Sequence, residues 1–242
     1  MPPSLARAAF LTLVLVGTAA ASRADEIGDF NAAVERVEGH NRVALGYLRT
    51  GSIDLASIEL DRLRADFAAL NRQFARKRPK VFSAEAYTLA MTDIATRLVT
   101  ADLMLNSGRA DAARQALDAV RADFYNLRRS AGIEVLADCV RDANAAMDAL
   151  MVFNDGALDW SKPATASAIG ERTAAYAKTL DRCDAMADAE VKKNPEFRRL
   201  VDGARASMKF IPQAIADHDT NLLHRVLIEL RSFDNLLAFR FG

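Results

Sequence analysis

Apolar residues recur along most of the chain at spacings of three and four, the period of an amphipathic α-helix. Two stripes in the first half share this spacing, Leu60, Leu63, Phe67 and Leu70 in one, and Leu117, Val120, Phe124 and Leu127 in the other. The pattern predicts helices over residues 28–50, 53–76, 84–107, 110–130, 133–153, 164–190, 195–216 and 220–240. Pro212 falls inside the seventh of these helices and predicts a kink or an early end there.

The two stripes belong to an internal repeat. Residues 48–70 and residues 105–127 are identical at eleven of 23 positions, at an offset of 57 residues. Each copy ends one helix at a glycine, Gly51 or Gly108, and has an aspartate three residues later, Asp54 or Asp111. Glycine suits the left-handed end of a helix, and aspartate caps the start of the next one. Each copy therefore predicts a tight helical hairpin.

A weaker third copy closes the chain. Its apolar and basic positions match the first copy at Leu227, Leu230, Arg231 and Leu237. His218 takes the place of the glycine, and Asn221 that of the capping aspartate. The pattern predicts an all-α protein of about eight helices in tandem antiparallel hairpins, with halves at residues 25–130 and 131–242. These hairpins would form either a helical-repeat array or two packed four-helix bundles.

The hairpin resembles the tetratricopeptide repeat. The family's order of an aromatic residue, a Gly, an Ala and a large apolar residue occurs at Tyr47, Gly51, Ala56 and Leu60, and is matched again at Ala101, Gly108, Ala113 and Leu117. The period here is 57 residues, longer than the 34 of the family. The resemblance implies a concave scaffold that binds proteins or peptides.

The N-terminus has the three parts of a secretory signal peptide. Arg7 supplies positive charge, residues 8–21 form an apolar run, and small residues follow up to Ala24. Cleavage is expected after Ala24, with Ala21 as a second site, so residues 1–24 are interpreted as a leader. An uncleaved membrane anchor is the alternative, but the run is shorter than the ~20 residues of a spanning helix. The mature protein is expected in the periplasm or outside the cell, without a transmembrane segment.

Two cysteines, Cys139 and Cys183, lie in the chain after this leader. In an exported protein such a pair predicts a disulfide. The residues lie at comparable distances from the connector at 154–163, so antiparallel helices bring them level. A redox or metal-binding pair is the alternative, but CxxC spacing is absent.

The charge of the chain is balanced, with 32 basic and 32 acidic residues. Without residues 1–24, 30 basic and 32 acidic residues remain, a net charge of −2. This balance predicts neither a basic block nor an acidic tail. Nucleic-acid binding by phosphate neutralisation is therefore disfavoured.

Recognisable catalytic motifs are absent, including those of serine hydrolases, zinc proteases, P-loop enzymes and dinucleotide-binding enzymes. We therefore expect a non-enzymatic protein with no cofactor. His40 is expected to be structural. His218, with Asp217 and Asp219 beside it, forms at most a weak metal site, and the six-residue step to His224 puts the two histidines on different helical faces.

Methionines on several helices support an alternative function, because thioethers bind Cu(I) and serve as axial haem ligands. They are Met91, Met104, Met147, Met151, Met186 and Met208. The competing interpretation is that they fill gaps in the core. The primary hypothesis is an exported scaffold that binds a protein or peptide partner in the cell envelope. The alternative is a periplasmic haem- or copper-binding bundle.

Two aromatic features complete the prediction. The C-terminus is apolar through Phe233, Leu236, Leu237, Phe239 and Phe241, and is expected to dock on the protein's own core or on a partner. Trp160, the single tryptophan, is expected to cover the end of a hairpin, with an exposed contact surface as the alternative.

Overall fold

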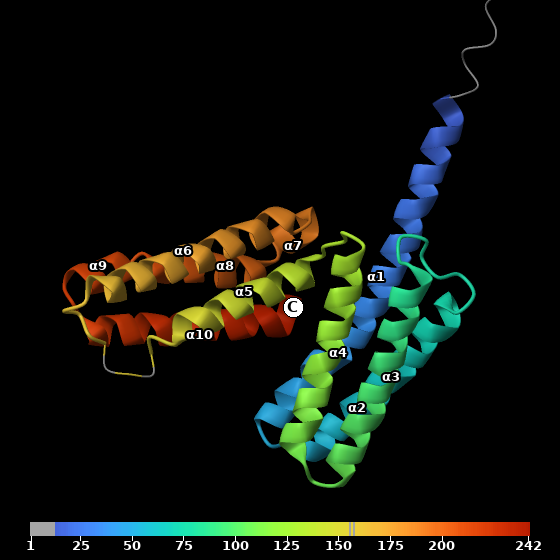
Figure 1. The fold of residues 1–242 in the computed structure, drawn as a ribbon, viewed down its shortest axis with the longest axis horizontal. Helices are drawn as coiled ribbons and strands as arrows, with labels where there is room; N and C mark the ends of the chain where they lie inside the picture. The colour runs from blue at the N-terminus through green and yellow to red at the C-terminus, as the bar shows by residue number, and fades with distance from the viewer. Residues whose placement is uncertain (1–12, 155, 157) are drawn as a thin grey trace, which may run out of the picture. The chain divides into compact units, whose positions relative to one another are not determined.

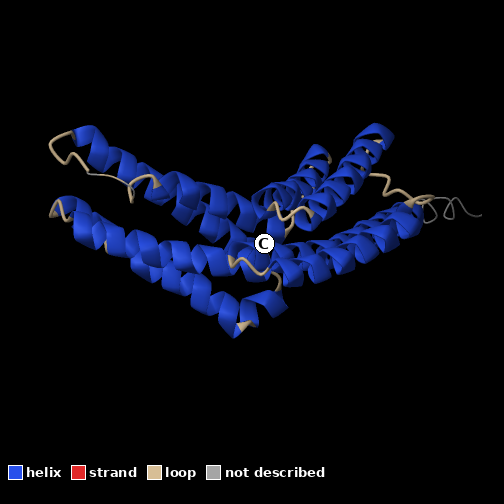
Figure 2. Cartoon of the chain, turned by 90° about the horizontal axis from the view of Figure 1, so that it is seen from below, coloured by secondary structure: helices blue, strands red, loops and turns tan. Residues whose placement is uncertain are grey.

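The computed structural model describes residues 13–154, 156 and 158–242, and these are helical without a strand (Figures 1 and 2). The helices are α1 (Leu13–Arg49), α2 (Ile53–Phe74), α3 (Ala84–Asn106), α4 (Ala110–Ser130), α5 (Leu136–Met151), α6 (Pro163–Met186), α7 (Ala189–Lys193), α8 (Pro195–Met208), α9 (Ile211–Ala216) and α10 (Thr220–Phe241). The all-α prediction is confirmed. Residues 1–12 of the expected leader lie outside the described part. Helix α1 begins at Leu13, within the remainder of the leader.

The chain divides into two compact units, unit 1 at Met1–Ile133 and unit 2 at Glu134–Gly242. In unit 1, helices α1 to α4 pack in sequence and α4 returns against α1, which closes an up-down-up-down bundle. Its core includes Phe30, Leu63, Ile94 and Phe124, one from each helix. Each of these four helices therefore buries apolar residues in one shared core.

Unit 2 is a second bundle with a core of its own. Helix α5 packs against α6, α6 against α8, α8 against α10, and α10 against α5. Met147, Tyr176, Phe197 and Leu230 are completely buried between these helices. The short helix α7 precedes α8 in the chain, and the short helix α9 follows it.

Two of the predicted helices are interrupted in the structure. The helix expected over 195–216 ends at Met208, and α9 begins at Ile211 with Pro212 in its first turn, so the predicted early end is confirmed. The helix expected to continue to residue 190 ends at Met186 instead. Asp188 caps a new helix there, because its side chain accepts hydrogen bonds from the N–H groups of Glu190 and Val191.

The three copies of the repeat share one turn geometry. Gly51 and Gly108 have φ angles of 75° and 69°, and His218 takes the same left-handed conformation at 53°. In each turn the next N–H binds the carbonyl five residues earlier, in the pairs Ser52–Tyr47, Arg109–Met104 and Asp219–Ala214. The assignment of His218 to the glycine position of the third copy is therefore supported by its backbone.

The expected capping role of Asp54 and Asp111 is wrong. The N-cap residues of α2 and α4 are Ser52 and Arg109, and neither side chain makes a capping hydrogen bond. Only this N-cap residue separates the left-handed glycine from the helix, so both aspartates lie in the first turn, near the positive end of the helix dipole. In the third copy the cap is Asp219 rather than Asn221, and its carboxylate accepts from the Leu222 N–H.

Candidate functional site

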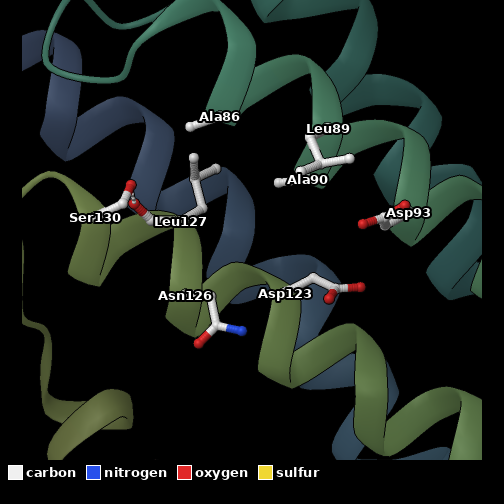
Figure 3. A pocket seen from close by; sticks show the side chains of 8 residues that line it. All are labelled: Ala86, Leu89, Ala90, Asp93, Asp123, Asn126, Leu127 and Ser130. Atoms are coloured by element: carbon white, nitrogen blue, oxygen red, sulfur yellow. Dashed lines mark hydrogen bonds between the residues drawn. The ribbon is translucent and has the colours of Figure 1, made fainter.

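A hollow with mixed chemistry lies between α3 and α4 of unit 1 (Figure 3). It has a volume of about 200 Å³. Its lining comes from two helices, with Ala86, Leu89, Ala90 and Asp93 on α3 and Asp123, Asn126, Leu127 and Ser130 on α4. We call it the α3–α4 groove.

Small side chains create the groove. Ala86 and Ala90 lie one turn apart on α3, so this face of the helix leaves space beside α4. Leu127 is 3% exposed and forms an apolar floor, whereas Leu89 is 60% exposed. Leu89 thus adds exposed apolar surface beside this floor.

Carboxylates from both helices line one end of the groove (Figure 3). Asp123 accepts a hydrogen bond of 2.5 Å from Arg97 Nε, and this bond raises the pKa of Arg97. Asp93 stands four residues before Arg97 on α3, and its charge also raises the pKa of Arg97. One cation and two carboxylates leave this end with a net negative charge, which favours a basic group on the occupant.

The polar pair at the groove has an equivalent in the first copy of the repeat. His40 and Asp66 stand 57 residues before Arg97 and Asp123. His40 Nε2 lies 3.7 Å from Asp66, and His40 Nδ1 lies 2.7 Å from the carboxylate of Glu59. His40 thus lies between two carboxylates on α2.

The other two histidines, His218 and His224, have different surroundings. His218 stacks on Trp160 with ring centroids 5.5 Å apart. His224 is half-buried, and its Nε2 atom has no hydrogen-bond partner among the described residues. Across residues 13–154, 156 and 158–242, no cluster of three or more His, Cys, Asp or Glu has the arrangement of a metal site.

The methionines pack in the two cores. Met91 is buried in unit 1, and Met147 and Met208 are buried in unit 2. Met104, Met151 and Met186 are partly buried against the same cores. Their contacts are those of apolar residues that fill the interior.

The predicted disulfide is confirmed. Cys139 on α5 and Cys183 on α6 are bonded, with Cα atoms 5.4 Å apart. Both side chains are completely buried in unit 2. The bond joins two helices that are consecutive in the chain.

Trp160 and the C-terminus both dock on unit 2. The Trp160 indole N–H donates a hydrogen bond of 2.8 Å to Thr220 Oγ1, at the start of α10. Phe241 packs edge-on against Phe197 at 5.1 Å, and Leu237 is buried. The expectation that the apolar end docks on the protein's own core is confirmed for these residues.

A buried carboxylate lies inside unit 2. Asp234 on α10 is completely buried, at the position that Phe67 and Phe124 occupy in the other two copies. Burial raises the pKa of Asp234 to about 6, although a hydrogen bond from Asn144 and the charge of Arg231 act in the opposite direction. Burial, with the charge of Asp234, also raises the pKa of Tyr176.

A basic segment was not expected from the sequence and corrects the prediction that the chain has no basic block. Arg76, Lys77, Arg78 and Lys80 stand within five consecutive positions between α2 and α3. The overall balance of charge concealed them, because acidic residues elsewhere compensate. A count of charge in short windows would have found this segment.

No described helix combines the length and the apolar character that a bilayer span requires. The chain matches no protein-family model, no curated protein and no solved structure.

Proposed function

We propose that the protein is an exported, non-enzymatic helical adaptor that binds a peptide segment of a partner protein in the cell envelope. The observation that carries the proposal is the α3–α4 groove, with an exposed leucine, an apolar floor and two carboxylates. Such a groove on a rigid bundle can hold a side chain without reacting with it. The tetratricopeptide-like hairpin pattern supports the same class of function.

The dimensions of the groove favour a peptide over a large cofactor. Its volume of about 200 Å³ is below the ~300–1,000 Å³ typical of small-molecule sites. A peptide with a basic residue beside a medium-sized apolar residue matches the groove. The basic group would lie near Asp93 and Asp123, and the apolar side chain would contact Leu89 and Leu127. The Asn126 amide and the Ser130 hydroxyl offer hydrogen bonds to peptide backbone.

The proposed export rests on two observations. The chain begins with a segment that has the order of parts of a signal peptide. The disulfide between Cys139 and Cys183 is of the kind that persists in oxidising compartments. A partner is therefore sought among proteins of the envelope.

The test is a selection of peptides from a random displayed library on the immobilised protein. We expect enriched sequences that carry a basic residue next to an apolar one. Leu89→Asp should abolish capture of these peptides, because it places a charge against their apolar side chain. Leu103→Asp is the matched control, since Leu103 lies on the same helix and is 59% exposed against 60% for Leu89.

A second variant tests the charge. Asp93→Lys should reverse the preference for basic peptides, because it turns the net charge of the Asp93, Arg97 and Asp123 group positive. Enriched peptides without a basic residue, or equal loss of capture in Leu89→Asp and Leu103→Asp, would refute the assignment of the groove.

A further inference from the structure

The connection between α2 and α3 lines a second hollow in unit 1, together with Glu26 of α1. It has a volume of about 520 Å³ and is lined by Glu26, Ala75, Arg76, Lys77, Arg78 and Lys80. Four of the six lining residues carry positive charge, and one carries negative charge. The hollow lies at the end of unit 1 opposite to the turns at Gly51 and Gly108, because successive helices of the bundle are antiparallel.

Aromatic packing holds this connection in place. Phe82, at its C-terminal end, is 1% exposed and contacts Phe30 at 5.1 Å between ring centroids. Phe74, at its N-terminal end, contacts the same Phe30 ring at 5.3 Å. Arg78 donates hydrogen bonds to the carbonyls of Pro79 and Phe82. The basic segment is therefore anchored at both ends and in the middle.

The anchoring leaves three cations directed to solvent. Arg76, Lys77 and Lys80 are exposed, whereas Arg78 is half-buried. Within the described part of unit 1, no carboxylate lies within 4.0 Å of these three side chains. By contrast, Arg97 and Arg128 on the helices of unit 1 each contact a carboxylate. Among the described residues, these three cations form no ion pair, and a multiply charged anion can bind several of them together.

We propose that this hollow binds a phosphate-bearing anion. Guanidinium and ammonium groups are the donors that proteins use for phosphate oxygens, and Arg76 offers a fork that a lysine lacks. The four cations and Glu26 give the lining a net charge of +3, which selects anions of high charge. The hollow shares no lining residue with the α3–α4 groove.

The phosphate can come from a free polyphosphate or from a phospholipid head group, and both present the same oxygens. A nucleic acid fits less well. The lining has no aromatic side chain on which a base could stack, and the whole chain carries no excess positive charge. The proposal is therefore limited to small phosphates and lipid head groups.

The experiment measures binding of the purified protein to two probes. One is inorganic triphosphate, followed by calorimetry. The other is phosphatidylglycerol–phosphatidylcholine vesicles, followed by co-sedimentation, with vesicles of phosphatidylcholine alone as the reference. Arg76→Gln/Lys77→Gln should weaken binding on the order of tenfold or more. Glu26→Gln should strengthen binding about threefold or more, because it removes the opposing charge. A gain of this kind cannot arise from a damaged fold.

The matched control removes the same charge at the other end of the bundle. Arg49 and Arg109 are exposed beside the Gly51 and Gly108 turns, and Arg49→Gln/Arg109→Gln should leave both affinities unchanged. Binding of triphosphate alone would assign a free anion, and binding of vesicles alone would assign a head group. Three results overturn the proposal. They are no binding of either probe, equal weakening in the control variant, or a single-stranded oligonucleotide that binds more tightly than both probes and loses affinity in Arg76→Gln/Lys77→Gln.

Discussion

Asn144 on α5 donates a hydrogen bond of 2.6 Å to the carboxylate of Asp234 on α10, inside the core of unit 2. The second carboxylate oxygen of Asp234 has no partner among the described residues, and neither does the hydroxyl of Tyr176. Two copies of the repeat bury a phenylalanine where the third buries this acid. Unit 2 thus contains an ionisable group whose protonation depends on folding.

We expect unit 2 to lose stability as the pH rises from about 4 to about 6. The pKa of Asp234 is raised from 3.8 to about 6, so the folded state holds this proton more tightly than the unfolded state. The stabilisation is complete below the unfolded pKa and is lost as the pH passes the folded pKa, a difference of about 3 kcal/mol. Asp234→Asn cannot ionise and should be more stable than the native chain above pH ~6. Denaturation curves across this range test it, and parallel pH profiles of both proteins would contradict it.

The Glu38–Arg128 pair in unit 1 should show the behaviour of a buried ion pair. The side chains are 5% and 2% exposed, and their charged atoms lie 3.3 Å apart. Glu38→Leu should lower the free energy of unfolding by about 3–5 kcal/mol, because the buried Arg128 loses this carboxylate. Glu38→Leu/Arg128→Met should recover most of the loss. Urea titrations measure both, and a double variant as unstable as the single one would argue against this account.

Alanine substitutions at glycines should change stability in opposite directions. Gly108→Ala should destabilise by about 1–2 kcal/mol, because its φ of 69° is left-handed. Gly170→Ala, in the interior of α6 with free space at the Cβ position, should stabilise by about 0.5–1 kcal/mol. Gly203→Ala should destabilise, since a Cβ there would lie 2.7 Å from the Phe233 ring. Melting temperatures of the native chain and the three variants, measured in one buffer, test the sign of each change in stability.

Loss of the disulfide should weaken unit 2. Cys139 and Cys183 are 44 residues apart, and closing such a loop stabilises by about 4 kcal/mol in the chain-entropy model. We expect Cys139→Ser/Cys183→Ser to lower the melting temperature by several degrees or more. A reductant should produce the same decrease in the native chain and none in the variant. An unchanged melt in both would show that the bond contributes nothing to stability.

Processing of the N-terminus is directly measurable. We expect the intact mass of protein recovered from its own host to match a chain that begins at Asp25 or Ser22. Removal of the leader leaves unit 1 intact, because its described core begins at Ile27 and Phe30. A mass that includes residues 1–21 would establish an uncleaved segment and refute the leader assignment.

The sequence was sufficient for the helices because their apolar stripes are regular and glycines mark the turns. It was insufficient where backbone geometry or distant pairing decides the outcome. The prediction of Asp54 as a cap is wrong because backbone geometry, which residue types do not reveal, sets the number of residues between a left-handed glycine and the next helix. The end of α6 at Met186 depends on the Asp188 cap, which lies within an otherwise helical pattern.

The candidate sites were less predictable than the helices. The α3–α4 groove depends on Ala86 and Ala90 of α3 and on residues of α4 that lie far along the chain, and no local pattern in the sequence marks this pairing. The burial of Asp234 was missed because an acid interrupts the apolar stripe of the third repeat. The segment from Arg76 to Lys80 was visible in the sequence but was concealed by a net charge of zero.

The disulfide joins the two helices of a single hairpin, and this has a consequence for the order of folding. Helices α5 and α6 are consecutive, so Cys139 and Cys183 can meet before α8 and α10 are in place. Contacts between neighbouring segments form sooner than distant ones, because they close shorter loops. Oxidation can therefore precede closure of the bundle, and the covalently fixed hairpin becomes a template on which the last helices assemble.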